Sequence, residues 1–222
     1  MRHYAIAIDG PAGAGKSTIA KQVANHLNIV YVDTGAMYRA VALYCIQYGI
    51  NYNDQEEVKK ILDEINIKIE YKEDNQIILL NNKDITEEIR TQEVTKAAST
   101  VATIHAVRIK MVEFQRDIAK DTSVVMDGRD IGTCVLPNAN IKIFLTASVE
   151  ERAQRRYKEL CQKGIECTKG QIKSEIEARD KNDSTRKFSP LTKAEDAIEI
   201  DTTHYTIGEV ANKIIKIIES VQ

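Results

Sequence analysis

Short apolar runs alternate along this 222-residue chain with longer stretches in which apolar residues recur every three to four positions. The apolar runs predict buried strands, which lie at 4–9, 29–33, 123–127, 141–146 and 197–201. The helical periodicity covers 16–27, 34–48, 91–120 with a break near 104–105, 149–163, 169–181 and 207–221. Strands that alternate with helices predict an α/β fold with a parallel sheet covered on both faces.

One stretch interrupts this rhythm with a strand, a turn, an apolar strand and a second turn, at 67–71, 73–76, 77–80 and 81–84. The alternation of apolar and polar side chains in its first strand predicts a small antiparallel hairpin. We therefore expect an accessory lobe over residues 35–103, with a hairpin insert at about 66–85.

The composition fits one folded domain, because 43% of the residues are hydrophobic and only 29% are charged. The longest apolar stretches are far too short to cross a bilayer. A net charge of −2 argues against a nucleic-acid partner, since such proteins usually carry a basic surplus. A local excess of Lys and Arg over residues 148–193 suits a small polyanion better than a nucleic acid. A solvent-exposed helical face would have the same composition.

The four cysteines are Cys45, Cys134, Cys161 and Cys167, and no two of them form a CxxC pair. The four histidines form no cluster, so the spacing disfavours a zinc site or a disulfide framework. Reduced thiols and the lack of a signal-peptide pattern predict a cytoplasmic protein.

The strongest motif directly follows the first predicted strand and opens the first helix. It reads Gly10-Pro11-Ala12-Gly13-Ala14-Gly15-Lys16-Ser17, continues into Thr18, and matches G-x-x-x-x-G-K-[ST]. Glycines let backbone N–H groups surround phosphate oxygens, and the helix N-terminus favours the same negative charge. Lys16 would bind the β- and γ-phosphates, and the Ser17 hydroxyl would ligate Mg²⁺. The motif predicts nucleotide binding, but GTPases, motors and kinases share it.

Arginines follow two other predicted strands, in Asp33-Thr34-Gly35-Ala36-Met37-Tyr38-Arg39 and in Asp127-Gly128-Arg129-Asp130-Ile131-Gly132. The carboxyl ends of parallel strands share one edge, where ligands bind. Arg39 and Arg129 should therefore reach the same crevice as the phosphate loop. Each alone would more often be a surface residue. Together they indicate a second substrate that carries a phosphate group.

With these segments the chain resembles the bacterial cytidylate kinase family over nearly its whole length. Besides the phosphate loop and the two arginine segments, the resemblance rests on Ile89-Arg90-Thr91-Gln92-Glu93-Val94, Lys142-Ile143-Phe144-Leu145, Glu150-Glu151-Arg152-Ala153 and Ser189-Pro190-Leu191. It implies one kinase domain over 1–222, with a P-loop NTPase-type three-layer core. The 35–103 lobe would bind a nucleoside monophosphate, and residues 148–168 would form a short helical lid.

The resemblance also implies the activity and the site. A monomer would transfer the γ-phosphate of ATP to CMP or dCMP with Mg²⁺, and Arg39 and Arg129 would hold the acceptor phosphate. The expected acceptor-site residues are Thr34, Tyr38, Arg39, Ser99, Arg108, Arg129, Asp130, Arg179, Asp183 and Arg186. Within this set Arg179 and Asp183 would meet the ribose. The cytosine would lie among Thr34, Ser99, Arg108, Asp130 and Arg186.

Arg152, Arg155 and Arg156 share one helical face by their spacing. Spacing alone favours a solvated helix with glutamate partners, whereas resemblance to nucleotide-kinase lids makes these arginines cations that close over ATP. We therefore expect Lys16, Arg39, Arg129, Arg152 and Arg156 to be catalytic.

Magnesium would be held by Ser17 and the ATP phosphates, with Asp127 as the candidate acid and Asp9 or Asp33 as alternatives. The sequence offers no obvious general base, and a phosphate acceptor needs none, because it is largely ionised at neutral pH.

Two other classes remain open on the sequence alone. One is a kinase for a different small acceptor. The other is a GTPase-type switch that controls a partner, which should carry Asn-Lys-x-Asp. The two Asn-Lys pairs, in Asn82-Lys83-Asp84-Ile85 and Asn212-Lys213-Ile214-Ile215, do not fit that pattern.

Overall fold

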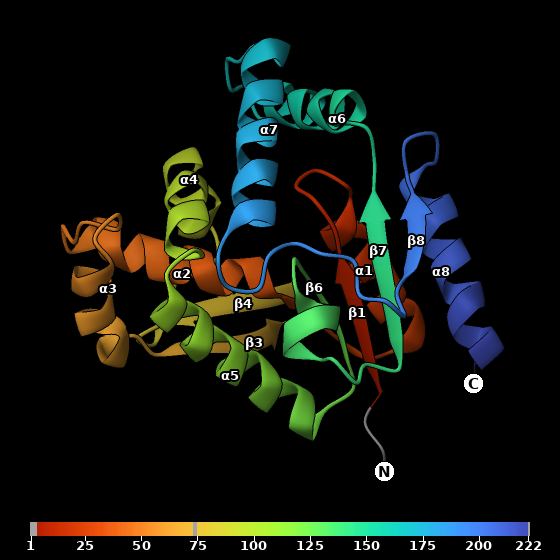
Figure 1. The fold of residues 1–222 in the computed structure, drawn as a ribbon, viewed down its shortest axis with the longest axis horizontal. Helices are drawn as coiled ribbons and strands as arrows, with labels where there is room; N and C mark the ends of the chain where they lie inside the picture. The colour runs from red at the N-terminus through yellow and green to blue at the C-terminus, as the bar shows by residue number, and fades with distance from the viewer. Residues whose placement is uncertain (1–3, 73–74, 222) are drawn as a thin grey trace.

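The computed structural model describes residues 4–72 and 75–221, and it is built on a five-stranded parallel sheet (Figure 1). The spatial strand order is β2-β6-β1-β7-β8. The strands are β1 Ala5–Asp9, β2 Val30–Asp33, β6 Val124–Gly128, β7 Ile141–Thr146 and β8 Ile198–Asp201. All their neighbours pair in parallel, so the predicted fold class is confirmed.

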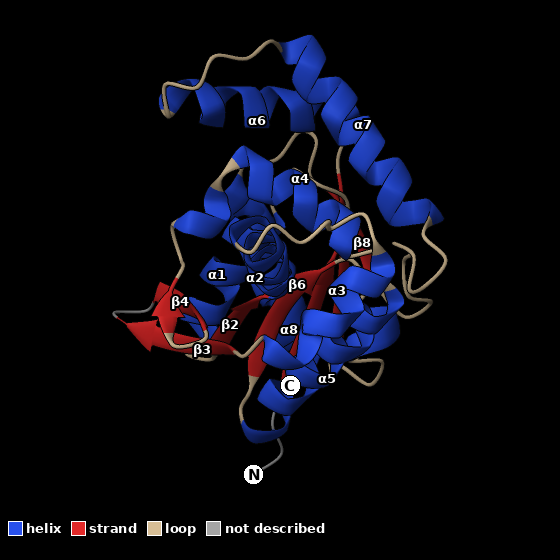
Figure 2. Ribbon diagram, turned by 90° about the vertical axis from the view of Figure 1, so that its left-hand side faces the viewer, coloured by secondary structure: helices blue, strands red, loops and turns tan. Residues whose placement is uncertain are grey.

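Helices cover both faces of this sheet (Figures 1 and 2). They are α1 Lys16–Leu27, α2 Thr34–Gln47, α3 Gln55–Ile61, α4 Gln92–Val101, α5 His105–Asp121, α6 Val149–Gln162, α7 Lys169–Thr185 and α8 Ile207–Val221. Alternate residues of β1 serve opposite faces: Ile6 and Ile8 lie in the core beneath α1 and α8, and Ala7 lies in the core beneath α2, α4 and α5. No helix in the described part of the chain has the length and apolar character to traverse a bilayer.

The predicted hairpin is present, but it has a third strand. In the antiparallel order β3-β4-β5, Ile67–Lys72 pairs with Asn75–Leu80, and that strand pairs with Lys83–Asp84. The turn predicted over 81–84 is therefore wrong in its second half. Asn81 and Asn82, with φ of 50° and 67°, make a two-residue turn that sets Lys83 opposite Leu80.

The turn predicted over 73–76 also ends earlier than expected, because Asn75 and Gln76 already belong to β4. Glu73 and Asp74 lie outside the described residues. The Gln76 carboxamide oxygen accepts a hydrogen bond of 2.9 Å from the backbone N–H of Asp33, which ties β4 to the end of β2. This contact is long-range, so local composition did not indicate it.

Helices α6 and α7 rise above the carboxyl edge of the sheet and pack on each other (Figures 1 and 2). They bury a small core of Ala153, Leu160, Ile172 and Ile176. Helix α7 continues to Thr185, one turn beyond the predicted end, and so returns toward the sheet beside α4. Helix α3, which the periodicity did not predict, is short and follows the N-cap residue Asp54, whose side chain accepts from two backbone N–H groups.

Candidate active site

A cleft of about 680 Å³ opens at the carboxyl edge of the parallel sheet. Its walls come from the phosphate loop, the segments after β2 and β6, helices α4 to α7, and residues 205–207. All ten predicted acceptor-site residues line this one cleft: Thr34, Tyr38, Arg39, Ser99, Arg108, Arg129, Asp130, Arg179, Asp183 and Arg186. The phosphate-loop residues that line it are Ala12, Gly13, Gly15, Lys16, Ser17 and Thr18, whereas Gly10, Pro11 and Ala14 do not.

The phosphate loop requires glycine where the backbone approaches its neighbours. A Cβ at Gly10 would lie 2.0 Å from the Leu145 carbonyl oxygen, and Gly10 has φ +148°. Gly15, with φ +85°, precedes the first residue of α1. Lys16 is buried, and its ammonium group donates to the Pro11 carbonyl at 2.7 Å. Burial, reinforced by the charge of Arg129, holds the pKa of Lys16 well below its usual value.

Asp127 lies beside the phosphate loop, in contact with Ser17. The Ser17 hydroxyl donates to its Oδ2 at 2.9 Å, and the Tyr31 hydroxyl donates to its Oδ1 at 2.7 Å. Burial and the nearby Asp33 raise the pKa of Asp127, so a divalent cation would favour its charged form. The described residues include no cluster of three or more His, Cys, Asp or Glu suited to a metal. A cation here would need phosphate oxygens and water as its other ligands.

The two alternative acids are engaged elsewhere. Both oxygens of Asp9 accept from backbone N–H groups, of Ile131 at 2.8 Å and Gly132 at 2.7 Å. Asp33 accepts from the Ala36 N–H at 3.0 Å and from the Arg39 guanidinium at 2.6 Å. Asp9 therefore fixes the loop after β6, and Asp33 orients an arginine of the cleft.

Burial raises the pKa of Asp9 from 3.8 to about 6, although its two backbone hydrogen bonds oppose the shift. A raised folded-state pKa gives a stabilising contribution that is complete below pH 3.8 and is lost as pH rises through about 6. We expect the free energy of unfolding to fall, relative to Asp9→Asn, by up to about 3 kcal/mol between pH 4 and 6.5. Urea unfolding of both proteins across this range measures the difference, and a constant difference would contradict the prediction. The hydrogen bond that asparagine cannot accept adds only a pH-independent offset.

Four cations converge on the middle of the cleft: Lys16, Arg39, Arg129 and Arg179. The Arg39 Nε is buried without a hydrogen-bond partner among the described residues. The Arg129 Nε donates to Asp183 Oδ2 at 2.8 Å. Burial and the charge of Arg129 lower the pKa of Arg179 to about 10. Asp33 and Asp183 pair with Arg39 and Arg129, and phosphate groups would supply further negative charge among these cations.

A buried ionic cluster also lines the cleft. Arg108 forms an ion pair with Asp130, and Arg186 contacts the other oxygen of Asp130 at 3.3 Å. Arg108 and Asp130 are only 3% and 4% exposed, so neither is a surface charge. The guanidinium of Arg108 also lies over the Tyr38 ring, 5.5 Å from its centroid.

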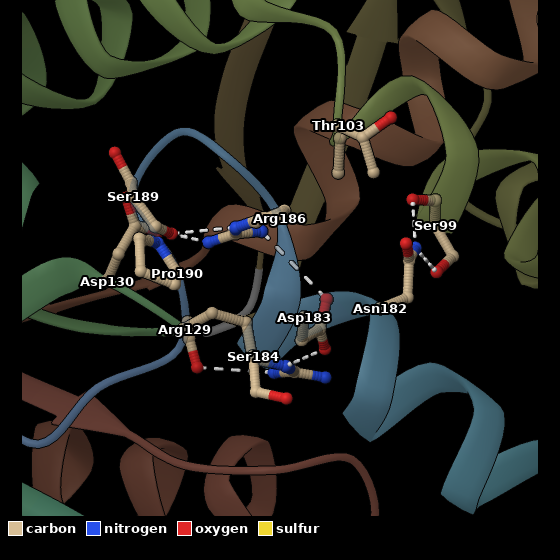
Figure 3. A network of polar contacts seen from close by, with 12 residues as sticks. Ser99, Thr103, Arg129, Asp130, Asn182, Asp183, Ser184, Arg186, Ser189 and Pro190 are labelled. Atoms are coloured by element: carbon tan, nitrogen blue, oxygen red, sulfur yellow. Dashed lines mark hydrogen bonds and ion pairs between the residues drawn. The ribbon is translucent and has the colours of Figure 1, made fainter.

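The other two predicted base-pocket hydroxyls already have partners. The Thr34 hydroxyl donates to the Asp127 carbonyl at 2.7 Å. The Ser99 hydroxyl accepts from the Asn182 side chain at 3.0 Å, as Figure 3 shows. Asn182, which the sequence did not single out, is not among the residues that line the cleft but holds Ser99, which is.

The three arginines of α6 differ in their contacts and in whether they line the cleft. Arg155 donates to the Thr202 hydroxyl and carbonyl oxygens, Arg156 pairs with Glu159 at 2.7 Å, and both line the cleft. Arg152 is not among the lining residues and is 4% exposed, with its guanidinium against Ala12. The structure therefore places Arg152 against the phosphate loop, outside the set of residues that line the cleft. The backbone of the loop comes so close that a Cβ at Gly13 would lie 3.2 Å from the Arg152 Cβ.

A parallel α/β sheet, a complete phosphate loop at its carboxyl edge and a cationic cleft beside it define a P-loop phosphotransferase. The sequence model of the cytidylate kinase family matches residues 6–220, and the chain belongs to that family. It is 55% identical to the cytidylate kinase of Pediococcus pentosaceus over 217 residues, covering 98% of this chain and 96% of that one. The cytidylate kinase of Leuconostoc mesenteroides is also 55% identical, over 220 residues that cover 99% of this chain and 98% of that one.

Solved structures with low identity share the fold. An uncharacterized protein from Eubacterium ventriosum superposes with a TM-score of 0.53 at 16% identity, covering 99% of both chains. A shikimate kinase from Bacteroides thetaiotaomicron gives a TM-score of 0.50 at 12% identity, covering 97% of this chain and 98% of that one. The predicted P-loop kinase fold and the resemblance to cytidylate kinases are both confirmed.

Proposed function

We infer that this protein is an ATP-dependent cytidylate kinase that converts CMP and ATP to CDP and ADP. The inference rests on membership of the family over residues 6–220. The prediction from sequence rested on resemblance to the same family. The cleft supports it independently, because its lining combines a phosphate loop, a buried acid–arginine cluster and further cations. Two phosphate-bearing substrates would fit this lining.

Positioning and charge neutralisation account for the transfer. The acceptor phosphate has a second pKa of about 6, so its attacking oxygen is largely ionised and no general base is needed. Lys16 would neutralise the β- and γ-phosphates, while Arg39 and Arg129 hold the acceptor phosphate in line. Ser17 and Asp127 would hold Mg²⁺, which would supply positive charge to the donor phosphates during the transfer.

The finer features of the reaction extend this proposal. The acceptor would be CMP or dCMP, with Arg179 and Asp183 at the ribose. Residues 35–103 would work as the monophosphate-binding lobe and residues 148–168 as the lid, with Arg156 closing over ATP. The protein would act as a monomer in the cytoplasm, as the sequence predicts.

A substrate panel tests the proposal. The protein is incubated with Mg-ATP and each of CMP, dCMP, UMP, AMP and GMP, and ADP formation is recorded against a sample without acceptor. We expect ADP formation with CMP and dCMP well above the other three. ADP formation with another monophosphate alone would assign a different acceptor. ADP formation that no acceptor stimulates would favour a nucleotide-hydrolysing switch.

Arg129→Ala should lower kcat/KM for every accepted monophosphate by a similar factor, because a phosphate contact does not read the base. A charge-assisted contact contributes about 1.5–3 kcal/mol, which corresponds to about a tenfold to hundredfold loss. Initial rates with CMP, dCMP and UMP measure the loss. Lys181→Ala, an exposed position on α7, is the matched control and should be neutral. A loss confined to one base would move Arg129 from the phosphate to the base pocket.

A further inference from the structure

Asp180 lies on α7, outside the cleft, and contacts the phosphate loop. Its Oδ1 accepts from the Ala12 backbone N–H at 3.3 Å, and its Oδ2 accepts from the Arg152 guanidinium at 2.5 Å. Arg152 in turn donates to the Ala12 carbonyl oxygen at 3.0 Å. The ion pair therefore holds both polar groups of one residue of the loop.

Arg152 is itself fixed by the core. Its Nε donates to the Ala147 carbonyl at 2.9 Å, and its side chain is 5% exposed. A buried ion pair adds little net stability, because desolvation offsets the attraction, but its geometry is strict. Within the described residues, no backbone N–H from Gly13 to Ser17 donates to a protein acceptor. The pair thus holds the outer limb of the loop and leaves the inner N–H groups free for phosphate.

The same turn of α7 also contacts the acceptor side. Two and three residues after Asp180, Asn182 donates to the carbonyl and hydroxyl oxygens of Ser99 on α4, and Asp183 accepts from Arg129 (Figure 3). One helical turn therefore contacts the donor loop, the acceptor lobe and an acceptor-site arginine. A helix is stiff over such a distance, so a displacement at one of these contacts also displaces the others.

We propose that Asp180 is a positioning residue that couples the ATP site to the CMP site through the rigid end of α7. The inference rests on the proposed function. Ordering of the phosphate loop by ATP fixes Ala12, Asp180 follows Ala12, and Asp183 then sets Arg129 for the acceptor phosphate. Each substrate should consequently tighten the binding of the other by the same factor.

Equilibrium binding tests the coupling without catalysis. The dissociation constant of CMP is measured by calorimetry alone and with a saturating non-hydrolysable ATP analogue, for the unmodified protein and for Asp180→Ala. We expect the analogue to tighten CMP binding at least about fivefold in the unmodified protein. In Asp180→Ala this factor should approach one, while CMP binding without the analogue changes less than twofold. Glu177→Ala, whose carboxylate is exposed on the same helix, is the matched control and should keep the full factor.

The outcomes separate this inference from the proposed function. CMP binding that the analogue tightens equally in both proteins would overturn the inference alone, even if Asp180→Ala melts at a lower temperature. The same holds if the analogue does not tighten CMP binding to the unmodified protein. Failure of the unmodified protein to bind CMP would overturn the proposed function as well. If Asp180→Ala does not fold, Asp180→Asn keeps the shape and the bond from Ala12 but loses the ion pair, and it should still lower the factor at least about twofold.

Discussion

We expect Lys16→Ala to keep its fold and to lose at least about a hundredfold in turnover. The substitution removes a cation that faces the phosphates of the donor at the closed end of the loop. The fold should survive, because burial already disfavours the charged form of this lysine and its pKa is lowered accordingly. A group that is costly to bury contributes little to the free energy of unfolding. Circular dichroism and an ADP-coupled assay at saturating CMP measure the two effects.

Lys21→Ala is the matched control for this experiment. Lys21 lies on the same helix, α1, and is exposed, so its removal should change turnover less than twofold. Near-normal turnover in a folded Lys16→Ala protein would show that this loop does not bind the donor. A loss confined to KM for ATP, with turnover intact, would mean that the lysine binds ground state and transition state equally.

The sequence predicted the cleft because its parts follow strands. Arg39 and Arg129 come shortly after β2 and β6, and the parallel register sets Asp33 opposite Asp127 at the same edge. A strand end is a local signal, and the parallel sheet brings such ends together. The residues of the site could therefore be predicted from the sequence before any contact was known.

The contacts within the site could not be predicted from the sequence in the same way. Asp9 and Asp33 end β1 and β2, and Asp127 is the next-to-last residue of β6 between them, so the sequence left all three as magnesium acids. Their hydrogen bonds distinguish them: those of Asp9 depend on the three-dimensional path of residues 131–132, whereas Asp33 accepts from Ala36 and Arg39 in the helix that follows it. Likewise, spacing placed Arg152 on a helical face but could not say that the phosphate loop packs against it. Long-range partners decide such roles, and helical periodicity contains no information about them.

The accessory sheet shows the same limit at the level of elements. Turn composition over 81–84 was correctly read at Asn81 and Asn82, whose backbones are left-handed. Lys83 and Asp84 have turn-like composition too, yet they pair with β4 and form β5. Two polar residues carry no apolar alternation, so only the pairing with β4 reveals that they are a strand.

We expect Arg108 and Asp130 to distinguish cytosine from uracil in the acceptor. Cytosine has an amino donor at position 4 and acceptors at N3 and O2, whereas uracil has a carbonyl at position 4 and an N–H at N3. Arg108 can only donate, and ionised Asp130 can only accept. Their ion pair is buried, and its carboxylate already receives hydrogen bonds from Arg108 and Arg186, which leaves room for one more donor. The cytosine amino group can supply that donor, and the uracil carbonyl cannot.

Each buried polar group that uracil leaves unpaired costs about 1–3 kcal/mol. Two such mismatches correspond to discrimination on the order of tenfold to ten-thousandfold in kcat/KM for CMP over UMP. We expect Asp130→Ala to lower this ratio by at least about tenfold, and Asp130→Asn to do so without opening a cavity. Asp117→Asn, an exposed position on the helix that carries Arg108, is the matched control and should leave the ratio unchanged. Because Asp130→Ala also leaves two buried arginines without their carboxylate, its stability should be measured alongside. Equal use of CMP and UMP by the unmodified protein would contradict both the base-reading pair and the assignment of CMP as the acceptor.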